Sequence, residues 1–125
     1  MKKLLLVDDD AFLRDMYAIK FSDSGYEVQI AETGHEAITI IKESPDLDVI
    51  LLDMVMPGMS GIELISEIKD TFPDLDALCI VLSNQGEDSD VTAALSAGAA
   101  GYIVKAEAIP SDVVEQVANI MSAKK

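Results

Sequence analysis

The chain has no tryptophan, a single cysteine and few basic residues: 9 lysines and arginines stand against 23 aspartates and glutamates. One cysteine cannot form an internal disulfide, and Cys79 lies in an apolar run, so we expect a buried core residue in a reducing compartment. The formal net charge of −14 repels nucleic acid phosphates and anionic membranes. These absences exclude a disulfide-rich secreted module and argue against direct DNA binding.

Long hydrophobic runs are also missing, and none approaches the roughly 20 residues of a membrane span. Residues 4–7 resemble the start of a signal peptide, but three aspartates, Asp8 to Asp10, interrupt the stretch too early. We therefore expect a cytoplasmic protein. The 125 residues, half of them hydrophobic, predict one domain over residues 1–125, with no output domain.

Five short apolar or alternating segments predict strands, and the segments between them have helical spacing. The predicted strands are residues 4–7, 26–30, 49–52, 78–82 and 102–104. Strict alternation of strand and helix predicts an α/β fold, a doubly wound five-stranded parallel sheet with five helices. Residues 26–30 alternate between apolar and polar, which indicates an edge strand, whereas the other four segments look more central.

The first helix is predicted over residues 11–22, with Phe12, Met16 and Ile19 on its inward face and Gly25 in the following turn. Asp10 is expected to cap this helix.

Capping-box patterns at 33–36 and 60–63 open helices two and three. Helix four is predicted before Gly98, with residues 86–90 left open as loop or first turn, and helix five after Pro110. Val91, Ala94 and Leu95 are the apolar residues of helix four. The residues expected inward in helices two, three and five are Ala37, Ile38, Ile41, Leu64, Ile65, Ile68, Val113, Val117, Ile120 and Met121.

Carboxylates follow two of the apolar strands directly: Asp8 and Asp9 after the first, and Asp53 after the third. Ligands of open α/β folds bind at the carboxyl ends of the strands. Periodicity does not give the strand order, but the order 2-1-3-4-5 would bring these carboxylates together at the switch point. Clustered carboxylates repel one another, and a hard divalent cation reverses that cost, so we expect a Mg²⁺ site.

Two further groups stand at strand ends: Ser83 at the fourth and Lys105 after the fifth. Metal carboxylates, a nucleophile, a hydroxyl donor and a cation are the parts that phosphoryl transfer requires, because it depends on positioning and charge neutralisation.

With these parts, the chain closely resembles the receiver domain of bacterial two-component response regulators, over residues 3–123. The resemblance rests on four motifs taken together: Leu6-Val7-Asp8-Asp9, the segment from Asp53 to Gly61, Leu82-Ser83, and the segment from Gly98 to Lys105. It implies a flavodoxin-like fold and a signalling phosphoacceptor that catalyses its own phosphorylation and dephosphorylation rather than an enzyme with a separate substrate.

The resemblance also implies roles for single residues. Asp53 would be the phosphoacceptor, and Asp9, Asp53 and the backbone carbonyl of Val55 would ligate Mg²⁺, with Asp8 binding it directly or through water. Lys105 would pair with Asp53 and later with the phosphoryl group.

Ser83 would hydrogen-bond a phosphoryl oxygen, and Tyr102 would then move, so that the surface of helix four and strand five switches. Packing without any switching is the alternative for Tyr102. The implied partners are a sensor histidine kinase or a histidine phosphotransfer protein, an unidentified downstream target, and a second copy in a phosphorylation-dependent dimer. His35 is expected on the surface and is not the phosphodonor.

The chain departs from the family's usual pattern at three places. Ala106 replaces the proline that usually follows the lysine, often with a cis peptide bond. Asn84 replaces a small residue and narrows access to Asp53. Two residues beyond the phosphoacceptor, Val55 cannot orient an attacking water, although Gln85 could, so we expect a fairly long-lived phosphoryl group.

Three other functions, and one other organisation, are weighed against this interpretation. A phosphatase of the haloacid dehalogenase type uses an aspartate after strand one, but Phe12 does not fit its motif. A flavodoxin would need a phosphate-binding loop after strand one. Ala106 and Asn84 motivate a pseudo-receiver, an interaction module without phosphate. A receiver cut from a longer protein is the organisational alternative.

Overall fold

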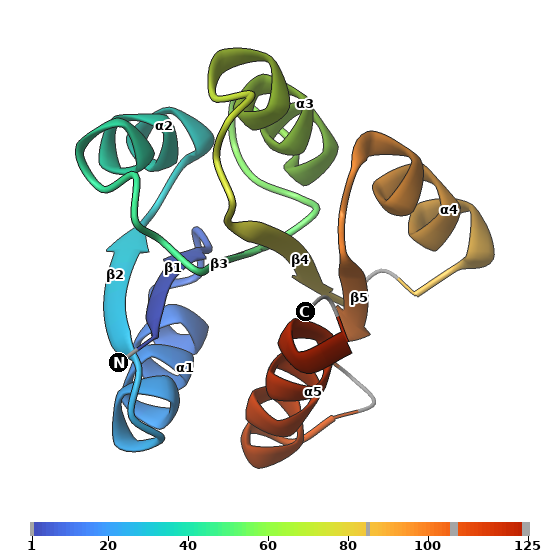
Figure 1. Ribbon diagram of the computed structural model, residues 1–125. Coiled ribbons are helices and arrows are strands. Elements are labelled where there is room, and N and C mark those ends of the chain that lie inside the picture. Colours follow the sequence, from blue (N-terminus) through green and yellow to red (C-terminus); the bar gives the residue numbers. More distant parts are fainter. Residues whose placement is uncertain (1, 85, 106–107, 124–125) are drawn as a thin grey trace.

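The computed structural model describes residues 2–84, 86–105 and 108–123, and it forms one sheet covered by helices on both faces (Figure 1). The sheet has five parallel strands in the order β2-β1-β3-β4-β5, the order that would bring the carboxylates together. Its strands are β1 (Lys3–Val7), β2 (Glu27–Ala31), β3 (Val49–Leu52), β4 (Leu78–Ser83) and β5 (Gly101–Val104). The second strand lies at an edge, as its alternating pattern indicated, and β5, whose segment looked more central, forms the other edge, as the order 2-1-3-4-5 requires.

Five helices connect the strands, and they divide between the two faces of the sheet. Helices α2, α3 and α4 cover one face, and α1 and α5 cover the other (Figure 1). Their bounds are α1 (Ala11–Asp23), α2 (Gly34–Glu43), α3 (Gly61–Thr71), α4 (Asp88–Ala97) and α5 (Pro110–Ala123). In the described part of the chain, no helix has both the length and the apolar character of a membrane span.

Alternate residues of the central strands feed two separate hydrophobic clusters. In β1, Leu5 and Val7 pack under α2 and α3, whereas Leu4 and Leu6 pack under α1 and α5. All four side chains are buried. This two-sided burial explains why the central strands read as continuous apolar runs.

Helices two and three follow the sequence prediction closely. Thr33 accepts a hydrogen bond from the Glu36 amide, and Ser60 and Glu63 form a reciprocal capping box. Helix α2 buries Ala37 and Ile41, with Ile38 partly buried, and α3 buries Leu64, Ile65 and Ile68.

Helix α4 begins at Asp88. Of the segment 86–90, residues 88–90 therefore belong to the first turn of the helix, and residues 86 and 87 precede it. Gly98 ends the helix with a φ of 116°, a left-handed conformation that favours glycine. Ala94 is buried, whereas Leu95 is exposed. In α5, Val113 and Val117 are buried, with Ile120 and Met121 partly buried.

The inward face predicted for the first helix was largely wrong. Phe12 is 76% exposed and Ile19 is 63% exposed, whereas Arg14, Tyr17 and Phe21 are buried. The buried set also has helical spacing, and Phe21 packs edge to face on Tyr26 at a centroid distance of 5.2 Å.

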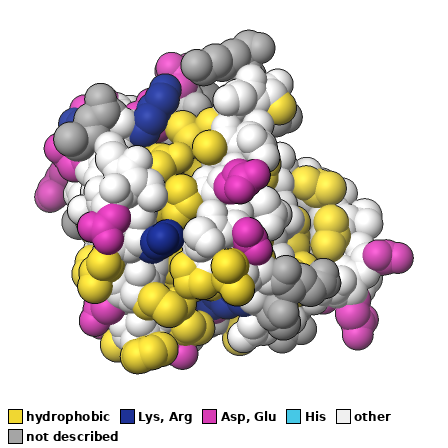
Figure 2. Space-filling model, turned by 90° about the horizontal axis from the view of Figure 1, so that it is seen from below, with side chains coloured by type: hydrophobic (Ala, Val, Ile, Leu, Met, Phe, Trp, Pro, Cys, Tyr) yellow, Lys and Arg dark blue, Asp and Glu magenta, His cyan; other side chains and the backbone are white. Residues whose placement is uncertain are grey.

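Figure 2, seen from the side of α1 and α5, shows hydrophobic side chains gathered at the surface. Of the three residues predicted to face inward in α1, which are Phe12, Met16 and Ile19, only Met16 packs against the core.

Candidate functional site

The predicted site residues meet at the carboxyl end of the sheet because β1 and β3 are neighbours. Val7 and Leu52 are partners in the register, so Asp8 and Asp53 leave the sheet side by side. The backbone extends this pairing: the Asp53 amide donates to the Val7 carbonyl at 3.1 Å, and the Asp8 amide donates to Ala31 at 3.1 Å.

Three carboxylates form the centre of the site. One oxygen from each of Asp8, Asp9 and Asp53 lies within 4.8 Å of the others. Mg²⁺ binds oxygen at 2.0 to 2.1 Å in an octahedron, so opposite ligands are about 4.2 Å apart. The donor chemistry and the spacing of the cluster fit this ion after a small adjustment. The structure thus brings together the three carboxylates that the sequence indicated.

Val55, the fourth expected metal ligand, lies in the loop after β3. Its amide hydrogen points to Asp53 Oδ1 at an N···O distance of 3.4 Å, and its side chain is exposed. The role of its carbonyl oxygen stays a prediction.

Lys105 bridges two of the carboxylates. Its Nζ lies 2.9 Å from Asp8 Oδ2 and 3.3 Å from Asp53 Oδ2, and only 6% of its side chain is exposed. Burial alone would lower the pKa of Lys105, but the hydrogen bond with Asp8 and the charges of both aspartates outweigh it and raise the pKa. The resemblance implied the contact of this ammonium with Asp53, and the structure adds the contact with Asp8.

Asp8 is the buried member of the cluster, and both of its carboxylate oxygens have partners. Oδ1 accepts a hydrogen bond from the Asp10 amide at 3.0 Å, and Oδ2 accepts one from the Lys105 ammonium. Asp10 in turn caps α1 by accepting the Leu13 amide at 3.1 Å. Asp10 is therefore a helix cap, as predicted, and Asp8 is held rigidly beside the more accessible Asp9 and Asp53.

Ser83 and Tyr102 lie on neighbouring strands below the same edge. Ser83 ends β4 and is buried, and Tyr102 of β5 is half-buried. Burial raises the pKa of Tyr102, while its hydrogen bond with Ser83 acts in the opposite direction. The two residues expected to form the switch are thus in contact.

Two residues at this edge received no role from the sequence. Arg14 donates from Nη1 to the Asp8 carbonyl at 3.1 Å, and Gly61 lies so close to Asp53 that an added Cβ would be 2.3 Å from its carbonyl oxygen. A basic residue in helical register with Tyr17 and Phe21 was the available signal for Arg14.

The structure describes only some of the residues at which the chain departs from the family's usual pattern. Asn84 is exposed beside the site, whereas Ala106 and Gln85 lie outside the described residues. His35 is exposed on α2, in agreement with its expected surface position.

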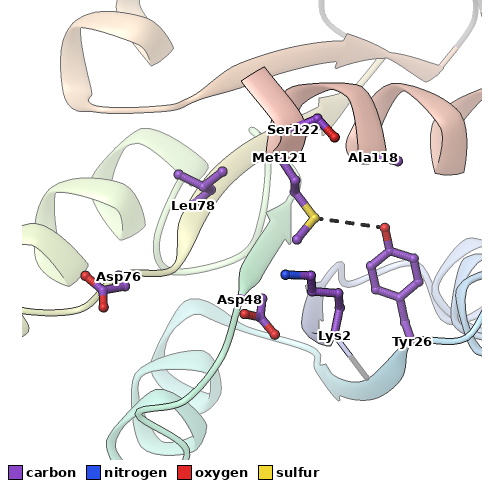
Figure 3. Close-up of a pocket in the computed structure, with 8 residues that line it drawn as sticks. All are labelled: Lys2, Tyr26, Asp48, Asp76, Leu78, Ala118, Met121 and Ser122. Atoms are coloured by element: carbon purple, nitrogen blue, oxygen red, sulfur yellow. Dashed lines mark hydrogen bonds between the residues drawn. The ribbon is translucent and has the colours of Figure 1, made fainter. Parts of the chain in front are cut away.

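A pocket of about 390 Å³ lies elsewhere, near the amino ends of the strands (Figure 3). The Tyr26 hydroxyl approaches Met121 Sδ there at 3.9 Å. The residues lining it are Lys2, Tyr26, Asp48, Asp76, Leu78, Ala118, Met121 and Ser122. None of the predicted site residues is among them, so the cluster of Asp8, Asp9 and Asp53 and this cavity lie at opposite ends of the strands.

Comparison with known sequences gives a family match along most of the chain. The profile described as "Response regulator receiver domain" matches residues 4–118. The chemotaxis protein CheY of Thermotoga maritima is 42% identical over 115 residues, covering 91% of this chain and 92% of CheY. CheY of Halobacterium salinarum is 36% identical, covering 98% of each chain.

Longer relatives match along part of their length. The phosphate regulon transcriptional regulatory protein PhoB of Pseudomonas aeruginosa is 40% identical over 105 residues, and the match covers 83% of this chain but 45% of PhoB. The chain thus spans about half the length of that relative.

Solved structures share the fold. CheY4 of Vibrio cholerae superposes with a TM-score of 0.87 at 27% identity, covering 96% of this chain and 98% of that one. A receiver domain protein of Clostridium thermocellum gives 0.86 at 27% identity, with 99% and 97% covered.

Proposed function

The chain belongs to the response regulator receiver domain family, whose members accept a phosphoryl group in two-component signalling, and we propose that Asp53 is its phosphoacceptor. One observation carries the proposal: Asp53 keeps 15% of its side chain exposed while Lys105 neutralises it from the buried side. Asp8, by contrast, is 3% exposed and engaged at both oxygens. An incoming phosphoryl group therefore meets Asp53 rather than Asp8.

The proposed reaction is a transfer between two proteins. An oxygen of Asp53 attacks the phosphorus of a phosphohistidine on a sensor histidine kinase or phosphotransfer protein. The phosphorus–nitrogen bond breaks, its electron pair stays on the imidazole nitrogen, and that nitrogen takes up a proton. Lys105 remains beside the new aspartyl phosphate, where its ammonium offsets the added negative charge.

Asp8, Asp9, Asp53 and the carbonyl of Val55 would hold Mg²⁺, which supplies neutralisation of the phosphoryl oxygens when bound. The support is the convergence of three carboxylates within 4.8 Å. Lys105 balances part of their charge in the absence of the ion.

Ser83 and Tyr102 form the proposed switch. Ser83 would donate its hydroxyl to a phosphoryl oxygen and so change its hydrogen bond with Tyr102. Because Tyr102 lies on the edge strand β5, beside α4, a change there alters the surface that these two elements share. A downstream protein, or a second copy of the chain, would bind that surface.

We further propose a cytoplasmic receiver, like the two CheY proteins that the match covers over 98% and 92% of their length.

The phosphoryl group is proposed to be long-lived, because the exposed Val55 side chain offers no polar atom to orient water. Val55→Asn should shorten the half-life of the phosphorylated form, measured by mass spectrometry after donor removal. An unchanged half-life would contradict this part of the proposal.

The decisive test is intact-mass spectrometry after incubation with acetyl phosphate, with Mg²⁺ or with a chelator. Wild type should gain one phosphoryl group only with Mg²⁺, and Asp53→Asn should gain none. Asp76→Asn, an aspartate at the opposite edge, is the matched control and should be labelled like wild type. Labelling of Asp53→Asn would overturn the assignment, and no labelling of wild type by any donor, a kinase included, would favour the pseudo-receiver.

The alternative of a haloacid-dehalogenase-type enzyme has poor support in the geometry. Its nucleophile would be Asp8, whose oxygens are both engaged and which is almost fully buried. Turnover of p-nitrophenyl phosphate abolished by Asp8→Asn would revive this alternative.

A further inference from the structure

Arg14 is a buried cation beside the acidic cluster that the phosphoacceptor mechanism does not use. It lies in the first half of α1, on the same face as Tyr17 and Phe21, and is 7% exposed. A lone arginine in such a place normally requires partners that satisfy its guanidinium. The identity of those partners indicates what Arg14 does.

Two partners come from the loops that follow β1 and β2. Nη1 donates to the backbone carbonyl of Asp8 at 3.1 Å, and Nη2 pairs with the Glu32 carboxylate at 3.4 Å. Asp8 follows β1 and Glu32 follows β2, so the guanidinium ties the ends of two neighbouring strands together. Its planar fork suits such a double contact, which a lysine ammonium does not reproduce.

The bond to Asp8 acts on the peptide that leads to Asp9. The Asp8 amide is already fixed to Ala31 at 3.1 Å, so with Arg14 on the carbonyl the backbone of Asp8 is held at both ends. The Asp8 carbonyl belongs to the peptide unit that joins Asp8 to Asp9. Its orientation therefore sets the direction in which the exposed Asp9 carboxylate leaves the strand.

Fold stability alone explains this arrangement poorly. The Nε atom of Arg14 is buried and, among the described residues, has no hydrogen-bond partner. The Glu32 side chain is 64% exposed, so water weakens its attraction to the guanidinium. An apolar side chain of similar length would fill the same space without an unsatisfied donor.

We propose that Arg14 is a positioning residue for the metal site: its guanidinium orients the Asp8–Asp9 peptide so that both carboxylates converge with Asp53 on one Mg²⁺. The inference rests on the proposed Mg²⁺ site. Groups that hold metal ligands in place typically change metal affinity about 10-fold to 100-fold when removed.

The sign of the effect separates positioning from simple charge. A guanidinium acting only through its positive charge would repel Mg²⁺, so its removal would tighten binding. A guanidinium acting only on the fold would leave the affinity of the folded protein unchanged. Positioning alone predicts that removal weakens the binding of Mg²⁺.

The experiment is isothermal titration calorimetry of the unphosphorylated full chain with MgCl₂, combined with thermal unfolding in chelator. Arg14→Met should raise the Kd for Mg²⁺ about tenfold or more. Arg14→Lys should give a smaller rise, and Glu32→Gln about a twofold rise. Lys20→Met, which removes a charge from the same helix away from the cluster, is the matched control and should keep the wild-type Kd.

A folded Arg14→Met variant with wild-type or lower Kd would overturn the proposal. If that variant does not fold, Arg14→Lys and Glu32→Gln decide, and wild-type affinity in both would equally overturn it. Wild-type protein that binds no Mg²⁺ would instead refute the proposed metal site, so the two failures are distinguishable.

Discussion

Lysines and carboxylates lie at both ends of the strands, but they differ in burial. The carboxyl edge is the end of the sheet that carries Asp8 and Asp53, and the amino edge is the opposite end, which carries Lys3. At the carboxyl edge, Lys105 contacts Asp8 and Asp53 with 6% of its side chain exposed. At the amino edge, Lys3 contacts Asp46 and Glu27 with 34% of its side chain exposed and both partners more exposed still. Composition alone does not distinguish these lysines, but their surroundings do.

Burial and convergence, rather than acidity, make one edge a candidate site. Two aspartates at the amino edge are each paired with Lys3: the Asp48 carboxylate accepts a hydrogen bond from the Lys3 amide at 2.8 Å, and Asp46 pairs with the Lys3 ammonium. Those at the carboxyl edge point toward a common centre. The pocket of Figure 3 lies at the amino edge, so cavity volume does not identify the chemistry here.

The largest contrast is expected on removing each lysine. Lys105→Met should destabilise the metal-free protein at pH 7 by about 3 to 5 kcal/mol, because two partly buried carboxylates lose their counter-charge. Lys3→Met should leave the urea midpoint close to wild type, since its partners remain hydrated. Equal losses in the two variants, measured by urea unfolding in chelator, would break the comparison.

Backbone packing should differ between the edges as well. Gly61→Ala is expected to cost about 3 kcal/mol, because the new Cβ would lie 2.3 Å from the Asp53 carbonyl oxygen. Gly25→Ala, in the turn before β2, meets no atom within 4 Å and should cost about 1 to 2 kcal/mol from its φ of +97° alone. Urea unfolding measures both losses. A smaller loss for Gly61→Ala than for Gly25→Ala would show that the backbone after Asp53 shifts readily to make room for the new Cβ.

Mg²⁺ should stabilise the protein through one edge only. At a concentration ten times its Kd, the ion should add about 1.4 kcal/mol to the free energy of unfolding. Asp9→Asn should abolish most of this increment, whereas Asp76→Asn should retain it. Thermal unfolding with Mg²⁺ and with chelator gives the increments, and a loss in Asp76→Asn would place an ion at the amino edge.

The smallest expected effect is on lysine titration in metal-free buffer. The pKa of Lys105 is raised above its ordinary 10.5, so the stability it contributes is present below pH 10.5 and lost as the pH rises through the raised pKa.

Asp8→Asn should lower the pKa of Lys105, because the hydrogen bond with the Asp8 carboxylate and its negative charge both raise that pKa in the wild type. Asp46→Asn should only return the raised pKa of exposed Lys3 toward normal. NMR of the lysine side chains would detect both changes in pKa. An unchanged pKa of Lys105 in Asp8→Asn would show that Asp8 is not its main partner.

Periodicity predicted the alternating elements well because each signal is local to its own segment. Helices α2 and α3 matched residue by residue, since their caps and apolar stripes lie within one stretch of chain. The strand order is not local, and periodicity did not give it. The order 2-1-3-4-5 was considered because it would bring the carboxylates together, and the roles of Asp53 and Lys105 came from the family resemblance.

Helix α1 shows where sequence reasoning failed. Its apolar stripe from Phe12 to Ile19 suggested the core, but Arg14 lies inward because its partners, the Asp8 carbonyl and Glu32, are brought near only by the folded sheet. Lys105 met Asp8 as well as Asp53 for the same reason. Contacts between distant segments decided these positions, and the only local sign was the helical register of Arg14 with Tyr17 and Phe21.

The ion pair between Lys105 and Asp8 joins residues 97 positions apart, almost the whole chain. During synthesis on the ribosome, Asp8 and Asp53 emerge long before Lys105, so a nascent chain has the acidic half of the site without its counter-charge. The site is complete only after β5 has paired with β4, a late and non-local step. We therefore expect only fully folded chains to accept a phosphoryl group, so incompletely synthesised chains should not take part in signalling.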